Sequence, residues 1–564
     1  MMFRLALIGL LAGSIGFGQL ATEQKIADFR HLAGLYAKQY APYEWKLAVE
    51  RFDLLDPGGW LDRVRATQDD LDFYDLMIEY VARLNGAHDV YTLPSNFSAT
   101  LSFAVDIYDG KVLVDWISRT RLPASEYPFQ IGDELISVDG RDVERLIAEL
   151  SKYSTSANPR STRRSAAGRI TTRPQSRIPR AIEVGDRAEV VIRRASGDLE
   201  TYSLPWIKTG LAMTVVGPVP TPQSRRMTAE AAATAPDYLA PLVELQNCEL
   251  PEKAAVLGQG SRTPIFAMPA GFNQRLGRSP SDVFFSGTFQ AQGYRIGFIR
   301  IPSYSPANTT AALAQFQREM AYFQENTDGL IIDDMRNSGG LLAYVNSLLQ
   351  YLIPFPFRAL GFEIRATSYW VTRFSSALES ARSRGAEPWI VRLTEAILQD
   401  VVTANRENRG RTGPLPLDDV SLDREPARDA GGAVLAYTKP LMVLVDEFSA
   451  SGGDAFPATI QDNRRGPIFG MRTMGAGGSV VTLGAGSYSE GSTGMTQALM
   501  IRKYPIVTSE YPAAPYVENI GVRPDLEADY MTRENLLNGG RAFVQAFTAA
   551  MVDHIRKNGG PAVP

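Results

Sequence analysis

The sequence predicts an α/β core in the C-terminal half of the chain, preceded by a small β-rich domain and an N-terminal helical segment. Apolar residues recur every three or four positions between Thr22 and about Leu93, which is typical of amphipathic helices. From about Phe97 the apolar spacing approaches two, as in strands with one buried face. From Gly293 onward short apolar runs alternate with helical patterns, and this alternation indicates an α/β fold.

Composition narrows the class of protein. The 564 residues accommodate three or four domains at about 150 residues each. With 58 basic and 62 acidic residues and a net charge of −4, the sequence gives no support for nucleic-acid binding. A single cysteine, Cys248, excludes an intramolecular disulfide and any metal site that needs two thiolates, and three histidines leave little room for a histidine-rich metal centre. We therefore expect no metal and no cofactor.

The N-terminus has the pattern of a secretion signal. Residues 1–4 supply a short positive region, residues 5–17 are apolar or small, and residues 18–21 offer small side chains for cleavage. The apolar run is shorter than the ~20 residues needed to span a bilayer, and no later run is long enough. We predict an exported protein, periplasmic or extracellular, without a stable membrane anchor. The alternative is a buried first helix.

Turn residues and changes of composition divide the rest of the chain. The strand patterns 101–107 and 112–117 flank Asp109-Gly110, a dipeptide typical of a tight hairpin. Residues 151–180 are rich in Ser and Arg and predict a solvated loop. The predicted boundaries are a signal peptide at 1–21, a helical segment carrying His88 at 22–96, a β-rich domain at 97–210, an insert or linker at 211–286, the α/β core at 287–530 and a C-terminal helical tail at 531–564.

The core pattern places three strands and two helices in order. We predict strands at 296–301, 329–334 and 441–445, and helices at 311–324 and 341–352. In α/β folds, functional groups gather where parallel strands end. The polar residues that follow these strands are therefore the first candidates for a site.

A serine lies at the point where strand 441–445 turns into a helix. Ser451 follows Ser449-Ala and precedes two glycines and a helical pattern at 454–462. On such a turn the hydroxyl points out of the sheet, and free amides at the helix N-terminus stabilise developing negative charge. Serine is also a common helix N-cap, so this segment alone fits a purely structural role.

Two further segments carry groups that nucleophilic chemistry would need. Strand 329–334 is followed by Gly339-Gly340, whose amides could form an oxyanion hole, although an ordinary glycine turn explains them as well. His88, one of three histidines, follows a helical pattern among turn residues. A lone loop histidine usually has no catalytic role, so only the segments taken together indicate one.

Taken in order, the segments match a known pattern. Residues 334–340 (DMRNSGG) fit D-x-R-x-x-G-G, residues 443–451 (VLVDEFSAS) fit a nucleophile segment, and residues 469–477 fit the segment that follows it. The chain thus resembles the S41 peptidases, which include the C-terminal processing and tricorn-core proteases. Residues 132–140 (GDELISVDG) resemble the core of a PDZ domain, a usual companion in that family. The resemblance implies a ClpP/crotonase-like α/β core and a PDZ-like domain at 97–210.

One departure from the pattern bears on the mechanism. The processing-protease branch uses a Ser–Lys dyad with the lysine inside G-K-G, and this chain has Ala476 at that position. Lys439 and Lys503 are the lysines of the predicted core, and neither is at the motif position. The chain is more similar to the branch that includes tricorn and chlamydial protease-like activity factor, which uses a Ser–His pair supported by Glu.

The resemblance implies roles for individual residues. Ser451, the second Ser of S-A-S, would be the nucleophile, His88 in LNGAH the base, and Glu518 in ENIGVRPD the acid that orients His88. Glu510 is the rival for the acid, and either glutamate fits a surface carboxylate as well. The expected oxyanion donors are the backbone amides of Gly452 and of Gly339 or Gly340.

We therefore expect a secreted serine endopeptidase that acts on polypeptides through an acyl-enzyme, without a nucleic-acid partner. Activity should fall near pH 6 to 7 as His88 gains a proton, since the ordinary pKa of histidine is about 6.5. The PDZ-like domain could bind an extended peptide as an added strand. Two alternatives stay open, a catalytically inactive PDZ-containing peptide-binding scaffold and an acyl hydrolase or esterase. A homo-oligomer is compatible with the sequence.

Overall fold

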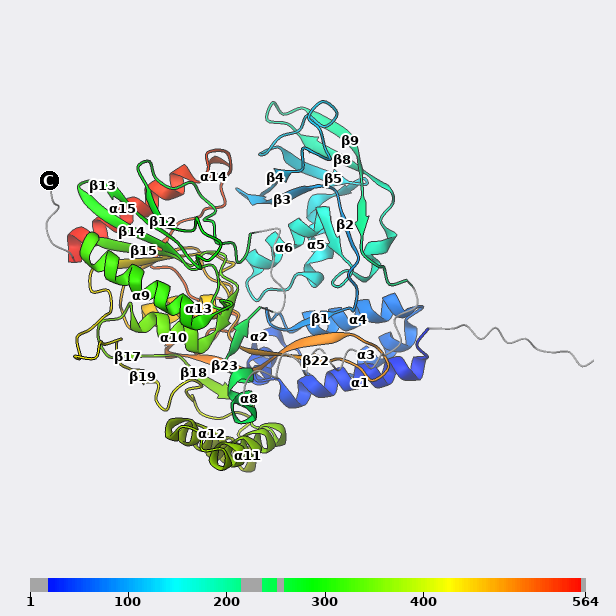
Figure 1. The fold of residues 1–564 in the computed structure, drawn as a ribbon. Helices are drawn as coiled ribbons and strands as arrows, with labels where there is room; N and C mark the ends of the chain where they lie inside the picture. Colours follow the sequence, from blue (N-terminus) through cyan, green and yellow to red (C-terminus); the bar gives the residue numbers. More distant parts are fainter. Residues whose placement is uncertain (1–18, 215–235, 251–257, 559–564) are drawn as a thin grey trace, which may run out of the picture.

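The computed structural model describes residues 19–214, 236–250 and 258–558 (Figure 1). Most of the predicted signal peptide, and the parts of the predicted linker at 215–235 and 251–257, lie outside these ranges. Within them, the chain forms an N-terminal helical segment, a β-rich PDZ-like domain and a larger α/β core. No helix of the described residues is long and apolar enough to cross a bilayer.

The N-terminal segment consists of helices that enclose a small aromatic core: α1 (Thr22–Gln39), α2 (Tyr43–Glu50), α3 (Gly58–Ala66) and α4 (Asp70–Ala82). α1 buries Phe29, Leu32 and Tyr36, which share one face of the helix. Asp69 caps the N-terminus of α4, because its side chain accepts a hydrogen bond from the amide of Asp72. A short strand, β1 (Val90–Thr92), follows α4 and pairs with β23 (Ser492–Ile506) of the core. This pairing brings residues 84–89 to the core.

The PDZ-like domain is built on a six-stranded sheet in the order β3-β4-β5-β8-β9, with β6 beside β5. The predicted hairpin is confirmed, because Tyr108 pairs with Lys111 across Asp109 and Gly110, which both have positive φ (49° and 77°) as such a turn requires. The elements are β3 (Phe103–Tyr108), β4 (Lys111–Ile117), β5 (Glu134–Val138), β6 (Arg141–Asp142), α5 (Val143–Leu150), α6 (Pro159–Thr171), β8 (Arg187–Arg193) and β9 (Leu199–Pro205).

The predicted solvated loop at 151–180 is wrong, because residues 159–171 form helix α6. Asn158 caps this helix by accepting from the amide of Arg160, and Pro159 occupies its first turn, where a proline needs no amide partner. The buried face carries Ala166, Ala167 and Ile170, which pack into the apolar core of the domain. The polar composition of the segment conceals this short apolar face.

Helix α6 also covers the edge of the PDZ-like sheet. β3 is an edge strand, yet all six of its residues are buried. Arg164 of α6 donates to both carboxylate oxygens of Asp106 in β3, at 2.9 and 2.6 Å. A peptide therefore cannot add to β3 unless α6 moves away. The opposite edge strand, β9, alternates between exposed and half-buried residues along most of its length.

The α/β core contains a seven-stranded sheet in the order β12-β13-β14-β15-β20-β21-β25, and its last five strands are parallel. The strands are β12 (Asn273–Leu276), β13 (Phe285–Ala291), β14 (Tyr294–Arg300), β15 (Gly329–Asp333), β20 (Leu441–Val445), β21 (Ile468–Gly470) and β25 (Leu526–Glu527), and the covering helices are α9 (Thr309–Asn326), α10 (Leu342–Gln350), α13 (Gly452–Asp462) and α15 (Arg541–Asn558). The predicted strands and helices of the core are confirmed to within two residues at each end.

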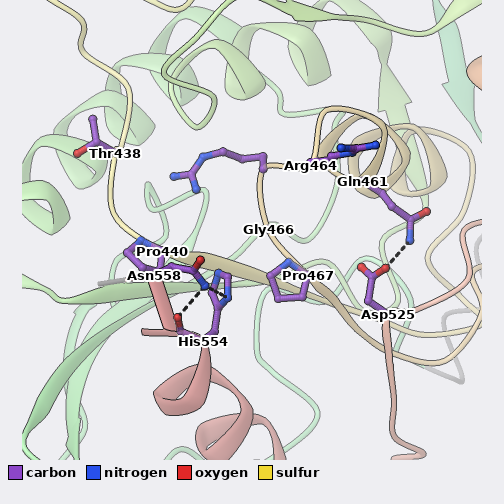
Figure 2. Close-up of a pocket in the computed structure, with 10 residues that line it drawn as sticks. Thr438, Pro440, Gln461, Arg464, Gly466, Pro467, Asp525, His554 and Asn558 are labelled. Atoms are coloured by element: carbon purple, nitrogen blue, oxygen red, sulfur yellow. Dashed lines mark hydrogen bonds between the residues drawn. The ribbon is translucent and has the colours of Figure 1, made fainter. Parts of the chain in front are cut away.

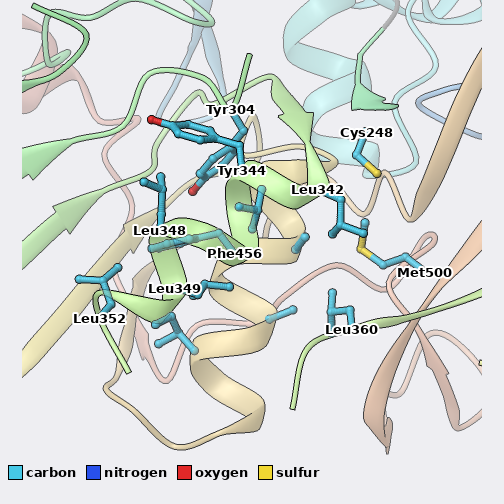
Figure 3. Packing of buried hydrophobic residues seen from close by; sticks show 14 of the residues in the cluster. Cys248, Tyr304, Leu342, Tyr344, Leu348, Leu349, Leu352, Leu360, Phe456 and Met500 are labelled. Carbon is cyan, nitrogen blue, oxygen red and sulfur yellow. The ribbon is translucent and has the colours of Figure 1, made fainter. Parts of the chain in front are cut away.

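Successive side chains of each strand point to opposite faces of the sheet, and apolar side chains on both faces explain why helices cover both. In β15, Leu330 and Ile332 pack with helices α9, α10 and α13, whereas Ile331 packs with α15 on the other face. Figure 3 shows the first of these layers, where the rings of Tyr304 and Phe456 stack with centroids 5.7 Å apart. Strands β15, β20 and β21 are buried along their whole length, as expected for parallel strands that are covered on both faces.

A second sheet joins the core to the N-terminal segment. Its long central strand β23 pairs with β1, β18 (Gly361–Ile364), β22 (Gly478–Gly484) and β24 (Ala514–Tyr516). Smaller elements complete the fold: β2 (Ser98–Thr100), β7 (Thr172–Pro174), β10 (Ile207–Thr209), α8 (Ala240–Leu245), β11 (Asn247–Glu249), β16 (Gly339–Leu341), β17 (Phe357–Arg358), α11 (Ser368–Ser383), α12 (Pro388–Arg406), β19 (Asp423–Arg424) and α14 (Arg533–Leu537). Helices α11 and α12 form a hairpin at one end of the molecule (Figure 1).

Candidate active site

The carboxyl ends of β15 and β20 hold the candidate site. β20 ends at Val445, the chain turns through residues 446–451, and α13 begins at Gly452. Ser449 fixes this turn, because its Oγ donates to the carbonyl of Asp334 at 2.8 Å and accepts from the amide of Asp446 at 3.1 Å. The hydroxyl of Ser449 is therefore engaged in holding the two strand ends together.

Ser451 sits in a strained backbone conformation at the start of α13. Its φ of 59° and ψ of −106° are rare for a residue with a side chain and persist only where surrounding contacts hold them. Asp454 provides these contacts, because its carboxylate accepts from the amide of Ser451 at 2.6 Å and from the amides of Gly475 and Ala476 at 2.9 and 3.0 Å. One buried carboxylate thus joins the serine turn to the following glycine-rich segment.

His88 reaches this serine from the N-terminal segment. Its Nε2 lies 2.8 Å from the Oγ of Ser451, and both side chains are buried. The contact spans 363 positions of sequence and depends on the pairing of β1 with β23. Burial lowers the pKa of His88 to about 4, so the imidazole stays neutral well below its ordinary range. A neutral imidazole at hydrogen-bond distance can accept the hydroxyl proton.

Glu518 lies near His88, but its side-chain contacts differ from those expected. Its Oε1 forms an ion pair with Nζ of Lys46 at 2.5 Å, and its Oε2 accepts from the amide of Gly477 at 2.9 Å. Among the described residues, Nδ1 of His88 has no hydrogen-bond partner. The direct bond by which Glu518 was expected to orient the imidazole is thus absent there, because Lys46 holds the carboxylate. The Glu518 charge still raises the pKa of His88 against the larger effect of burial.

Glu510, the alternative candidate for the acid, lies on the surface of the protein. It is exposed and pairs with Arg523 at 2.5 Å and with Arg472 at 3.4 Å. Within the described ranges, none of its hydrogen bonds or ion pairs reaches His88. These contacts favour Glu518 over Glu510 as the carboxylate that acts on the imidazole.

Of the expected oxyanion donors, only Gly452 is available in this structure. The amide of Gly339 donates to Oδ1 of Asn337 at 2.9 Å, and Gly340 pairs with Cys248 of β11 in an antiparallel ladder. The expectation for Gly339 and Gly340 is therefore corrected for this conformation. No hydrogen bond within the described ranges uses the amide of Gly452. A Cβ on Gly339 would approach the carbonyl oxygen of Cys248 to 2.2 Å, so the close backbone approach explains that glycine.

The lysines of the core lie away from the serine. Nζ of Lys439 donates to the carbonyl of Thr327 at 2.5 Å, before β20 begins, and Lys503 is exposed on β23. Ala476 stands beside Ser451 through its amide contact with Asp454 and carries no base. The lysine that does approach the site is Lys46 of α2, which no sequence motif selects. The sequence around Lys46 gives little indication of a functional role, since it is a single lysine in an eight-residue helix without a recognisable motif.

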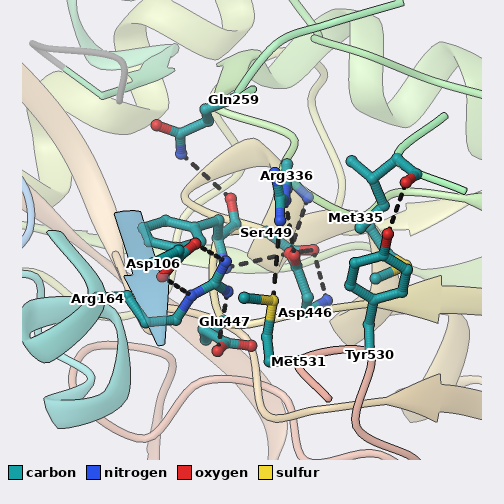
Figure 4. Close-up of polar contacts among 12 residues, drawn as sticks. Asp106, Arg164, Gln259, Met335, Arg336, Asp446, Glu447, Ser449, Tyr530 and Met531 are labelled. Atoms are coloured by element: carbon teal, nitrogen blue, oxygen red, sulfur yellow. Dashed lines mark hydrogen bonds and ion pairs between the residues drawn. The ribbon is translucent and has the colours of Figure 1, made fainter. Parts of the chain in front are cut away.

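An arginine network ties the PDZ-like domain to the serine turn (Figure 4). Arg164 of α6 bridges Asp106 of the PDZ-like sheet and Glu447 of the turn, to which its Nη1 lies at 3.0 Å. Arg160 adds a contact to Glu447 at 2.5 Å and another to Asp529 at 2.6 Å. The two arginines lower the pKa of Glu447 to about 2 against the effect of burial, so this carboxylate is ionised. The PDZ-like domain is therefore attached to the serine turn at Glu447, four residues before Ser451.

A separate cavity of about 490 Å³ lies at the N-terminal ends of the parallel strands, away from Ser451 (Figure 2). It is lined by Pro440 and Pro467, which precede the parallel strands β20 and β21, and by His554 of α15. Because catalytic groups of parallel sheets gather at the carboxyl ends, this position argues against a part in catalysis. Within the described ranges no cluster of His, Cys, Asp and Glu has the arrangement of a metal site.

Comparisons with known proteins agree with this architecture. Residues 295–528 match the model of peptidase family S41, and residues 97–212 match that of a PDZ domain. An uncharacterized protein of Chlamydia muridarum is 24% identical over 593 residues, which cover 93% of this chain and 92% of that protein. A protein of Chlamydia trachomatis serovar D is also 24% identical, with 96% of this chain and 94% of that protein covered.

Solved structures show the same fold. The crystal structure of mature CPAF, the Chlamydia protease-like activity factor, superposes with a TM-score of 0.73 at 21% identity and covers 96% of this chain and 99% of that one. Mature CPAF complexed with lactacystin gives the same TM-score at 20% identity, with 95% and 99% covered. With an S41 peptidase domain at 295–528 and a PDZ domain at 97–212, the chain is a serine-type peptidase.

Proposed function

We propose that the protein is a secreted endopeptidase that cleaves polypeptides through a Ser451–His88–Glu518 mechanism with a covalent acyl-enzyme. The observation that carries the proposal is the 2.8 Å approach of His88 Nε2 to Ser451 Oγ within a buried site. The low pKa of His88 supports it, since a base must be neutral before it accepts a proton. The core is proposed to be of the ClpP/crotonase-like type.

The chemistry follows from these positions. Oγ of Ser451 attacks the peptide carbonyl while Nε2 of His88 takes its proton, and the amide of Gly452 donates to the oxyanion. The imidazolium then gives the proton to the leaving amine, and the acyl group stays on Oγ. A water attacks the acyl-enzyme while His88 takes its proton, the imidazolium returns this proton to Oγ of Ser451 as the acyl–oxygen bond breaks, and the acid product leaves. The negative charge of Glu518 stabilises the imidazolium formed in each half.

Export is part of the proposal. It rests on the charged, apolar and small-residue order of residues 1–21. The mature chain would then act in the periplasm or outside the cell. An expression experiment with residues 1–21 present or deleted tests this point, because only the full chain should leave the cytoplasm and lose its first segment.

The function itself is tested by turnover of two matched substrates. Purified protein should hydrolyse an internally quenched peptide and should be inhibited by a fluorophosphonate. A catalytically inactive scaffold would do neither. An esterase would turn over the ester of an acyl group but leave the corresponding peptide bond intact, and this pattern would replace the peptidase assignment.

The acid can be tested by a pair of conservative variants. Glu518→Gln should lower kcat by roughly 10²–10⁴-fold, because it removes the buried charge that stabilises the imidazolium. Glu510→Gln is the matched control and should stay within about threefold of wild type, a change of less than 1 kcal/mol in the barrier. The measurement is steady-state peptide hydrolysis by folded variants, and the reverse pattern would transfer the role to Glu510.

A further inference from the structure

A fully buried lysine lies behind the candidate site. Lys46 of α2 has no exposed surface, and its Nζ contacts Oε1 of Glu518 at 2.5 Å, Oδ1 of Asn519 at 2.6 Å and the carbonyl of Asn85 at 3.1 Å. An ammonium has three donors, and these contacts use all of them. The lysine therefore joins the proposed acid to the turn that carries His88.

Glu518 depends on this lysine for its position. Its Oε2 is held by the amide of Gly477, whereas its Oε1 has the ion pair with Lys46 and no hydrogen bond from any other described residue. Burying a carboxylate to this degree is costly unless a cation or several donors compensate it. Lys46 supplies that compensation from an element outside the S41 domain.

We propose that Lys46 is a positioning residue of the peptidase site, which holds the carboxylate of Glu518 in place and adds a positive charge near His88. The proposal rests on the Ser451–His88–Glu518 mechanism. It assigns to the N-terminal helical segment two contributions to the reaction: the base itself and the cation behind the acid.

The charged groups around Lys46 come from several elements. Glu518 follows β24, Asp89 and His88 precede β1, and Tyr40 ends α1 and donates to Asp89 at 2.5 Å. Burial and the Glu518 charge raise the pKa of Asp89 to about 7, and Lys46 opposes this shift. Burial lowers the pKa of His88, the Glu518 charge opposes the change, and Lys46 adds to it. One cation is therefore shared between two carboxylates and an imidazole.

The charge of Lys46 determines the direction in which the pKa of His88 changes when this lysine is replaced. Removing the Lys46 charge should raise the pKa of His88, because the nearby cation that disfavours the imidazolium is gone. Activity requires neutral His88 and is lost as the pH falls through its pKa. The acid limb of the kcat/KM profile should therefore move to higher pH in a variant without the lysine charge.

The test measures kcat/KM for an internally quenched peptide against pH in the full chain. Lys46→Met should shift the acid limb upward by about one unit and lower kcat at neutral pH by roughly 10- to 100-fold. Lys46→Arg keeps the charge and should keep the position of the limb. The matched control is Lys25→Met in α1, which removes another buried lysine from its ion pair with Asp70 at 3.3 Å. That variant should keep the wild-type profile.

A double variant keeps the proposal testable if Lys46→Met does not fold. Lys46→Met with Glu518→Gln replaces the charged pair by a neutral pair of similar size. Glu518→Gln alone leaves the cation unopposed near His88, so its acid limb should lie below that of the double variant. Coincident limbs in these two proteins would overturn the role of Lys46, and so would an unshifted limb in folded Lys46→Met.

The outcomes separate this proposal from the mechanism on which it rests. If His88→Ala abolishes turnover while Lys46→Met behaves as wild type, the mechanism stands and Lys46 has only a structural role. If His88→Ala remains active, the proposed mechanism itself fails, whatever the lysine variants show. If Lys25→Met shifts the limb as much as Lys46→Met, the effect is a general consequence of a weakened helical segment and the proposal is wrong.

Discussion

Ser451→Ala should lower peptide turnover by about 10⁴- to 10⁶-fold, the largest effect expected of any single substitution in this protein. The loss follows from chemistry, since alanine has no group that can attack a carbonyl or be activated by His88. The backbone should persist, because Asp454 holds residue 451 through its amide and not through the hydroxyl. Initial rates with a quenched peptide, compared at equal concentrations of folded protein, measure the effect.

Ser449→Ala is the matched control for this substitution, two residues away in the same turn. Its hydroxyl bridges the ends of β15 and β20 through Asp334 and Asp446, so its removal should cost stability of about 1 kcal/mol. Turnover by the folded fraction should stay within about tenfold of wild type. If Ser449→Ala were inactive and Ser451→Ala active, the nucleophile would have been assigned to the wrong serine.

His88→Ala should lower turnover by about 10³- to 10⁶-fold, because no other basic side chain of the described residues is hydrogen-bonded to the Oγ of Ser451. The pH profile adds a second signature. The sequence predicts an acid limb near pH 6 to 7, but burial lowers the pKa of His88 to about 4. Since the neutral form is active, the limb should lie well below pH 6 and activity should be kept down to that limb.

Lysine substitutions provide the control for the base. Lys439→Ala and Lys503→Ala remove the lysines of the core, which contact Thr327 and solvent respectively, and should leave most of the activity. A lysine variant that stops turnover without unfolding the protein would contradict a Ser–His pair. An acid limb at pH 6 to 7 in wild type would show that water reaches His88 more freely than the buried contact indicates.

Local patterns predicted the elements around the site well. The strands that become β14, β15 and β20 contain the apolar runs IGFI, GLII and LMVLV, and such runs have few alternatives to a buried parallel sheet. The hairpin at Asp109-Gly110 depends on two residues that tolerate positive φ, so its signal is entirely local. The family motifs also selected Ser451 and His88, which the fold brings to 2.8 Å.

The features that sequence analysis missed depend on partners distant in the chain. Lys46 becomes part of the site through Asn519 and Glu518, and its contact with Asn519 spans 473 positions. Arg164 lies in a polar stretch that reads as a loop, but ion pairs to Asp106 and Glu447 allow its burial. A buried charge has no local signature, because only the complete fold supplies the opposite charge.

The oxyanion site illustrates the same limit. The glycines at 339 and 340 were selected because their amides follow a strand, and nothing in that segment reveals that Asn337 and β11 already occupy them. The structure leaves the amide of Gly452 as the described donor beside the serine.

Mass mapping of a fluorophosphonate adduct tests the central claim most directly. The wild-type protein should gain one phosphonyl group, and digestion should locate it on Ser451. The Ser451→Ala protein should gain none, and His88→Ala should react far more slowly because its serine has lost its base. An adduct on Ser449 or elsewhere, or labelling of His88→Ala at the wild-type rate, would contradict a nucleophilic Ser451 activated by His88.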